Sequence, residues 1–249
     1  MIVLPFAFEE KGNTSYAVMN TATCLNTVSQ YADAVFLIDN ERFRKTGSSL
    51  AQNFKQINQE IVQNFYDLCC AGEERNQKYV GSKVIDAGDI EQSLAELSVI
   101  GRGQVDLSAF YRWKRSHYRE GAKERSSASG ALLQAENNLT LGFDVRDARR
   151  ILALISAPKD VLTLTMLEEI SGFLQSKSPK SVIRIGDYPR KGTETSVTLV
   201  VSKLTKVTRM EDLYCRAEVS LKRQKVIDGE AERRIEQMHE TGKKLPILA

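Results

Sequence analysis

The sequence has few of the residues that build metal centres and disulfide frameworks. Its 249 residues include four cysteines and two histidines, and no two cysteines form a CxxC pair. Because structural zinc sites use four closely spaced Cys and His ligands, no zinc site is expected. The cysteines are therefore expected to be buried, reduced thiols that pack as small hydrophobic side chains. They are Cys24, Cys69, Cys70 and Cys215.

Long apolar runs and an excess of one charge are also absent. No run approaches the roughly 18 apolar residues of a membrane span, and the N-terminus lacks the pattern of a signal peptide. Thirty-five Lys and Arg residues against 32 acids leave a net charge of +3, which is too even to predict binding to nucleic acid or an anionic membrane. With 42% hydrophobic and 27% charged residues, the chain is expected to be a cytoplasmic protein of one large domain or two smaller ones.

The longest regular pattern runs from Ser48 to Ala71 and predicts one long helix. Ser48 or Ser49 can cap its start, and Gly72 can end it. Spacings of three and four residues give one apolar stripe, which is typical of a helix with one buried side. The stripe consists of Leu50, Phe54, Ile57, Ile61, Phe65 and Leu68. We interpret this helix as the connection between two structural units.

The segment before this helix predicts the end of a parallel α/β sheet. Ile2 to Pro5 and Ala34 to Ile38 are apolar runs typical of buried strands, and Asn13 to Tyr31 between them predicts a helix. Ligands of such sheets bind beyond the carboxyl ends of the strands, here near Asn40. Two strands are too few for a stable sheet, so further strands are expected to precede them.

The segment after the long helix predicts a second, smaller α/β unit with a mixed sheet. Helices are expected from about Ile90 to Leu97, up to about Glu136, and from Thr163 to Gln175. A strand with a glycine turn at Gly101 and Gly103 is expected between Leu97 and Val105. Further strands are expected at 150–156, 182–185 and 195–202, and a charged helical tail at 209–242.

Several motifs then occur in an order that resembles the later part of an FtsZ/tubulin-superfamily GTPase. They are LPFAFE near the start, IDNER after the second strand, the long helix with Phe54 and Asn58, VIDAGDIEQSL followed by IGRG, and the segment from DVRDARR to EEISGFL. The resemblance covers about four-fifths of the chain. It implies the end of a GTP-binding domain at 1–46, a central helix at 47–72, a C-terminal domain at 73–205 and a charged helical tail at 206–249.

The resemblance also implies a set of nucleotide contacts. Phe54 would stack on the guanine ring, Asn58 would bond its Watson–Crick edge, Asn40 would contact the purine and Glu9 the ribose. GTP or GDP, with Mg²⁺, would bind only in the complete protein. Three of these residues have an ordinary alternative: core packing for Phe54, a turn for Asn40 and a solvated loop charge for Glu9.

Asp86 and Asp89 also have two readings. A D-x-x-D pair before a helix is commonly a turn with a capping residue, here Asp89 bonding a free N–H. In the resembling family, this loop completes the active site of the neighbouring subunit and positions the water that attacks the γ-phosphate. Val84 stands where the bacterial motif has asparagine, so slower hydrolysis is one expectation.

The main departure from the family is the phosphate loop. No GGGTGTG sequence occurs, and Asn13 stands where a basic residue is expected after Glu9. Phosphates need a loop of backbone N–H groups, so this chain alone is not expected to hydrolyse GTP. Two hypotheses stay open: a portion of a GTPase that forms head-to-tail filaments, or a non-enzymatic module that caps or regulates such filaments.

Two segments suggest further partners. Phe110 to Arg119 interleaves aromatic and basic residues, which is compatible with a surface loop, a partner contact or a basic binding patch. In the resembling family the C-terminal end recruits membrane tethers or division partners, although KKLPILA is too short to assign that role.

Overall fold

The structure is a computed structural model that describes residues 2–6, 15–43, 50–71, 81–107 and 120–243. Glu9, the caps expected at Ser48 or Ser49 and at Gly72, the 110–119 segment and the last six residues lie outside these ranges. The chain divides into two compact units. One comprises Met1–Phe8 and Thr27–Val207, and the other Glu9–Asn26 and Thr208–Ala249.

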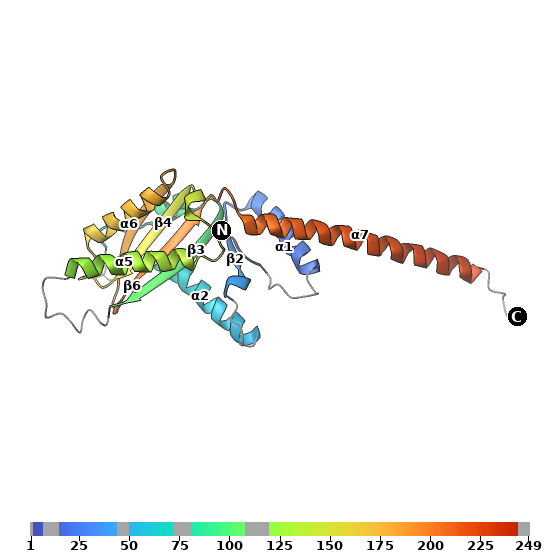
Figure 1. Cartoon of the computed structure of the whole chain (residues 1–249), viewed down its shortest axis with the longest axis horizontal. Coiled ribbons are helices and arrows are strands. Elements are labelled where there is room, and N and C mark those ends of the chain that lie inside the picture. Colours follow the sequence, from blue (N-terminus) through green and yellow to red (C-terminus); the bar gives the residue numbers. More distant parts are fainter. Residues whose placement is uncertain (1, 7–14, 44–49, 72–80, 108–119, 244–249) are drawn as a thin grey trace. The chain divides into compact units, whose positions relative to one another are not determined.

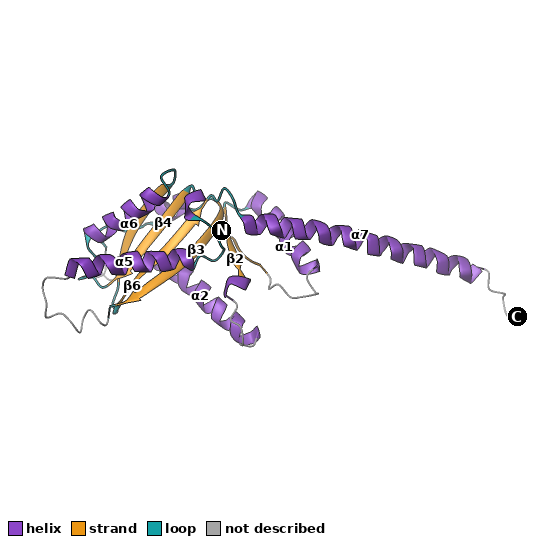
Figure 2. Cartoon of the chain, in the orientation of Figure 1, coloured by secondary structure: helices purple, strands orange, loops and turns teal. Residues whose placement is uncertain are grey.

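The first unit is built on one six-stranded mixed sheet (Figure 2), ordered β1-β2-β3-β6-β4-β5. Its strands are β1 (Ile2–Phe6), β2 (Ala34–Asp39), β3 (Glu96–Asp106), β4 (Arg150–Ala157), β5 (Val182–Pro189) and β6 (Glu194–Ser202). The pairs β1/β2, β2/β3 and β4/β5 are parallel, whereas β6 is antiparallel to both β3 and β4. The predicted fold class, α/β with a mixed sheet and a long helix, is confirmed.

The helices lie close to their predicted positions. They are α1 (Ser15–Tyr31), α2 (Leu50–Cys70), α3 (Ala87–Ser93), α5 (Glu120–Asn137), α6 (Leu164–Lys177) and α7 (Thr208–Lys243), with short 3-10 helices η1 (Asn40–Phe43) and η3 (Val145–Asp147). The expected range of α3, Ile90 to Leu97, is wrong. The helix starts three residues earlier because Asp86 caps it, and Leu94 already has an extended backbone.

Helices cover both faces of the sheet. On β3, Ile100 belongs to the core cluster that also includes Phe36 of β2 and Leu68 of α2. Phe65 of α2 packs against this cluster. The rings of Phe36 and Phe65 meet edge to face, with centroids 4.9 Å apart. Because side chains alternate along a strand, Gly101 and Gly103 point to the opposite face, where α5 lies (Figure 1).

A buried ion-pair network fixes α2 to this sheet. The Asp67 side chain is only 1% exposed, and its Oδ2 lies 2.5 Å from Nε of Arg102 on β3. Its Oδ1 lies 3.2 Å from an amino group of Arg190, which follows β5. Gln63 donates a further hydrogen bond of 3.0 Å to the same Oδ1. The buried carboxylate therefore has partners on both oxygens, as a buried charge requires.

The expected glycine turn between Leu97 and Val105 is wrong, because β3 runs continuously through both glycines. A Cβ on Gly103 would lie 2.0 Å from the carbonyl oxygen of Ala131, and one on Gly101 would lie 2.2 Å from that of Ala135. The glycines are needed for the close approach of the α5 backbone to the strand, and not for a turn.

The expectation of four buried cysteines is also wrong. Cys24, Cys69 and Cys215 are exposed and Cys70 is half-buried, all as free thiols. Cys24 precedes buried Leu25, and Cys69 follows buried Leu68. One residue along a helix turns the side chain by about 100°, which places both thiols beside the buried stripe.

The predicted tail helix is confirmed as α7, a helix of 36 residues. Most of its side chains are exposed, and Lys222 with Glu218 forms an ion pair of 2.7 Å along its surface. Within the described residues, no helix has the length and apolarity that crossing a bilayer requires.

We predict that Gly103→Ala destabilises the chain by at least about 1–3 kcal/mol, because the new methyl group meets backbone atoms that cannot move independently. Gly172→Ala is the matched control, since nothing lies within 4 Å of a Cβ at that helical position. It is expected to be neutral or to stabilise by up to about 1 kcal/mol. Urea unfolding of both variants measures the difference, and equal stability would show that α5 does not approach β3 this closely.

Candidate functional site

The acidic loop, Asp86 to Asp89, is held by a reciprocal capping box at the start of α3. Oδ1 of Asp86 accepts a 2.7 Å hydrogen bond from the backbone N–H of Asp89, and Oδ2 of Asp89 accepts one of 3.4 Å from the N–H of Asp86. The expected turn and cap are therefore present, but the capping residue is Asp86 and not Asp89. Each carboxylate uses one oxygen in this box. Asp86 is exposed and Asp89 is half-buried, so both remain accessible to a partner or a water molecule.

Asp187 on β5 anchors the segment that leads into the acidic loop. Its buried carboxylate accepts hydrogen bonds from the backbone N–H groups of Ser82, at 2.8 Å, and Lys83, at 2.5 Å. Its own N–H donates to the carbonyl oxygen of Lys83 at 3.0 Å. Gly81 allows this contact, since a Cβ there would lie 2.7 Å from the Asp187 carboxylate. The approach to the loop is thereby attached to β5, the last strand of the sheet.

Two arginines hold α3 itself. Nε of Arg184 on β5 lies 3.4 Å from Oδ1 of Asp89, and the same guanidinium donates to Oε1 of Gln92 at 2.6 Å. Arg150 on β4 donates to the carbonyl oxygens of Gln92, at 2.8 Å, and Leu94, at 3.3 Å. Because cations are favourable beside the carbonyls that end a helix, Arg150 stabilises the C-terminal end of α3.

Sequence reasoning missed Arg184 and Asp187. Both lie far from the acidic loop in the chain, and the parallel pairing of β4 and β5 brings them beside it. The only local signal was polar residues in a strand otherwise rich in apolar side chains. The loop is therefore not an isolated helix start but a segment held by three residues of the sheet.

The base-contact residues predicted on α2 lie in its first turns. Phe54 is 45% exposed and Asn58, one turn later, is also exposed, whereas Ile57 between them is 1% exposed. Side chains four residues apart lie on the same side of a helix. The core-packing alternative for Phe54 is therefore wrong, because nearly half of its side chain is accessible.

Asn40 lies where its position in the sequence predicts. It is the first residue of η1, directly beyond the carboxyl end of β2, and it is half-buried. The buried carboxylate of Asp39 accepts a 3.2 Å hydrogen bond from the N–H of Glu41 and so shapes this turn. The η1 and α2 elements contact each other, which places Asn40 on an element next to the helix that carries Phe54.

The base-contact residues and the acidic loop lie toward opposite ends of α2. Leu68, in the last turns of α2, shares a core cluster with Ile85, which immediately precedes Asp86. At a rise of 1.5 Å per residue, Phe54 and Leu68 are about 20 Å apart along the helix axis. Among the described residues, no group of acidic, His and Cys side chains is arranged to hold a metal ion.

Comparison with known proteins shows to which family this chain belongs. Residues 47–219 match the family described as the tubulin-like CetZ C-terminal domain. Tubulin-like protein CetZ3 of Haloferax volcanii is 27% identical over 209 residues, which are 80% of this chain and 54% of that protein. CetZ of Thermococcus kodakarensis is 22% identical over 174 residues, 69% of this chain and 41% of that protein. The chain thus spans about half the length of the curated relatives it matches.

Solved structures share the fold. CetZ2 from Haloferax volcanii, in a GTPγS-bound protofilament, superposes with a TM-score of 0.70 at 23% identity, over 90% of this chain and 60% of that one. An FtsZ dimer from M. jannaschii gives 0.62 at 21% identity, over 80% of this chain and 53% of that one. The chain therefore belongs to the tubulin-like CetZ family within the FtsZ/tubulin superfamily, and it carries the C-terminal portion.

Proposed function

We propose that this chain is the central-helix and C-terminal portion of a cytoplasmic tubulin-like GTPase that polymerises head to tail into filaments. In this proposal the acidic loop of one subunit completes the nucleotide site of the next. Phe54, Asn58 and Asn40 contact the guanine base, Glu9 contacts the ribose, and Asp86 with Asp89 positions the attacking water.

The observation that carries this proposal is the separation of the two groups along α2. The base-contact residues and the acidic loop are about 20 Å apart along a rigid helix, so one nucleotide cannot contact both in a single subunit. A head-to-tail stack brings the end of one subunit to the start of the next, and such a heterologous contact extends into an open filament. Solved relatives support this arrangement, since CetZ1 is described as a GDP-bound monomer and CetZ2 as a GTPγS-bound protofilament.

The chemistry of the acidic loop suits phosphoryl transfer to water. Catalysis of this reaction rests on positioning and on electrostatic stabilisation, with Mg²⁺ neutralising charge on the nucleotide phosphates. Two accessible carboxylates at fixed positions can accept hydrogen bonds from a water molecule and orient it. The capping box, Asp187 and Arg184 restrict the motion of this pair. The phosphate-binding loop is not among these 249 residues, so hydrolysis is proposed only for a protein that also supplies one.

The tail helix is the proposed surface for other partners, whether membrane tethers or proteins of cell division. Several large apolar side chains of α7 are exposed although the helix is otherwise strongly charged. They include Val226, Ile227, Ile235 and Met238.

The alternative function is a non-enzymatic module that caps or regulates filaments. The observation behind it is that residues of this chain alone form the acidic loop, with Asp86 and Asp89 in a capping box. The DNA upstream of Met1 separates the two proposals. A reading frame that continues upstream and encodes GGGTGTG supports the GTPase, whereas a stop codon and a ribosome site close to Met1 support the module.

We predict that Asp86→Asn and Asp89→Asn each lower GTP turnover of the complete gene product by at least about 100-fold while GTP still binds, since each removes a charge that orients water. Turnover per subunit is measured against protein concentration, where wild type should rise cooperatively. Asp228→Asn, on exposed α7, is the matched control and should keep normal turnover. Unchanged turnover in both loop variants would show that the loop is only a helix start.

We predict that Phe54→Ala weakens GDP binding by the complete gene product about 5- to 150-fold, because stacking on an aromatic ring contributes roughly 1–3 kcal/mol per base. Binding is measured by titration with a fluorescent GDP analogue. Since Phe54 is 45% exposed, this variant should unfold within about 1 kcal/mol of wild type, whereas Ile57→Ala should lose about 2–5 kcal/mol. Normal GDP affinity in Phe54→Ala would contradict its role at the base.

We predict that Arg184→Gln lowers turnover about 3- to 30-fold without weakening nucleotide binding, because Asp89 loses the cation that fixes its orientation. The measurement is kcat against KM for GTP, with sedimentation to confirm that filaments still form. Arg146→Gln is the control, because Arg146 pairs with Asp144 outside the acidic loop. Equal effects in the two variants would exclude a specific role for Arg184.

A further inference from the structure

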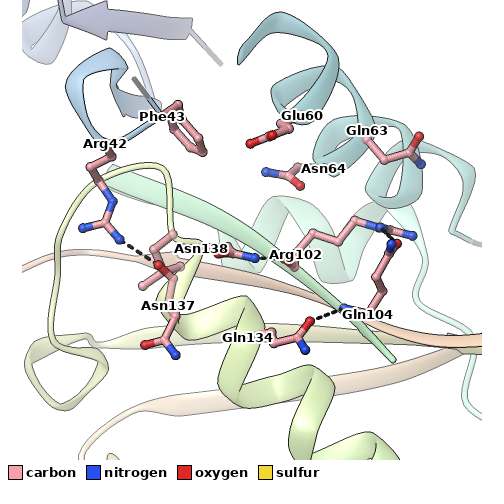
Figure 3. Close-up of a pocket in the computed structure, with 11 residues that line it drawn as sticks. Arg42, Phe43, Glu60, Gln63, Asn64, Arg102, Gln104, Gln134, Asn137 and Asn138 are labelled. Carbon is pink, nitrogen blue, oxygen red and sulfur yellow. Dashed lines mark hydrogen bonds between the residues drawn. The ribbon is translucent and has the colours of Figure 1, made fainter. Parts of the chain in front are cut away.

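A polar cavity of about 510 Å³ lies beside β3, on a different side of α2 from the base-contact residues. It exists because β2 pairs with β3 only from Ala34↔Glu96 to Phe36↔Ser98 and then leaves it. Beyond that point, the edge of β3 that pairs with β2 faces no strand among the described residues. The other edge stays paired with β6. The cavity is bounded by α2, η1, β3 and the end of α5 (Figure 3).

Side chains of the α5 region take over the bonding of this strand edge. Oε1 of Gln134 accepts from the N–H of Gln104 at 3.1 Å, and Nδ2 of Asn138 donates to the carbonyl of Arg102 at 3.0 Å. Thr140 accepts from the N–H of Ile100 through Oγ1 and donates its own N–H to the carbonyl of the same residue. Two carboxamides of the cavity floor, those of Gln134 and Asn138, are therefore held in place by the strand.

The buried carboxamide of Asn64 has no such bond. Asn64 on α2 is 6% exposed, and its side chain points into the cavity (Figure 3). It makes no hydrogen bond with any residue that the structure describes. Asn64 thus presents a donor and an acceptor to whatever fills the space.

The charges of the lining restrict the class of ligand. Arg102 is already paired with buried Asp67, and Arg42 donates to the carbonyl of Asn137 at 2.7 Å. Glu60 adds one negative charge to the lining. With these charges of both signs, the cavity does not select an anion or a cation. It offers carboxamides, which donate and accept side by side, and the ring of Phe43.

We propose that this cavity binds an uncharged nucleobase, carried as a nucleoside, through Asn64 and the ring of Phe43. Asn and Gln carboxamides match the adjacent donor and acceptor of adenine in a bidentate pair, and aromatic side chains stack on any base. The volume lies within the range of roughly 300–1,000 Å³ of small-molecule sites. The cavity is distinct from the proposed guanine site, because Asn58 and Asn64 are about 120° apart around the α2 axis. The inference does not depend on the proposed GTPase function.

The test is the melting temperature of the 249-residue chain titrated with adenosine up to about 5 mM, with glucose as the control for a site that accepts any polyol. Adenosine is expected to raise the melting temperature in a saturable way, as a ligand that binds only the folded state does, and glucose to leave it unchanged. Asn64→Leu should fold with equal or higher stability, because an unpaired amide is removed, and should bind adenosine at least about 10-fold more weakly.

Gln59→Leu, at an exposed position of α2 to which no role is assigned, is the matched control and should keep the full response to adenosine. Three results would overturn the proposal: no response to adenosine, an equal response in Asn64→Leu, or an equal response to glucose. A response lost in Asn58→Leu but kept in Asn64→Leu would also overturn it, because the base would then bind beside Phe54. None of these results bears on the turnover experiments with the acidic loop.

Discussion

The fixed position of α2 on the sheet is the constraint on which the other features of the site depend. Asp67 provides it by joining the helix to Arg102 of β3 and to Arg190 beyond β5 through a carboxylate that is 1% exposed. Removing one partner of such a buried network typically costs about 3–5 kcal/mol, because an uncompensated charge remains. The edge-to-face contact of Phe65 with Phe36 of β2 adds an apolar constraint on another side of the same helix. Together they set the orientation of every side chain that α2 presents.

This orientation gives α2 a buried face and an exposed one. The buried face carries Ile57 and Leu68, which fill the core, and Asn64, which faces the polar cavity, whereas the first turns expose Phe54 and Asn58. The acidic loop follows near its other end and is held by Asp187 and Arg184 of β5. The predicted base-contact residues and the acidic loop, toward opposite ends of this helix, suit the proposed head-to-tail assembly, in which each subunit must present a site at each end.

Sequence periodicity was sufficient to predict the helices and strands, but not the contacts between them. The apolar stripe predicted α2, an apolar run predicted β4 and a β-branched run predicted β6, because local patterns report burial directly. The same stripe could not separate Phe54, which is half exposed, from Ile57, which is buried. Gly101 and Gly103 were misread as a turn because the α5 residues that they contact, Ala135 and Ala131, lie well beyond them in the sequence. Asp187 and Arg184 were missed for the same reason, since only the pairing of distant strands brings them to the loop.

The central claim, that the acidic loop acts on the neighbouring subunit, is tested most directly by mixing two inactive variants of the complete gene product. One carries Asp86→Asn with Asp89→Asn and keeps its own nucleotide site, and the other carries Phe54→Ala with Asn58→Leu and keeps its acidic loop. In random head-to-tail filaments of an equal mixture, about a quarter of the interfaces join an intact site to an intact loop. The account predicts that GTP turnover recovers to about that fraction of wild type. Turnover that stays at the level of the separate variants, in filaments shown to contain both, would contradict it.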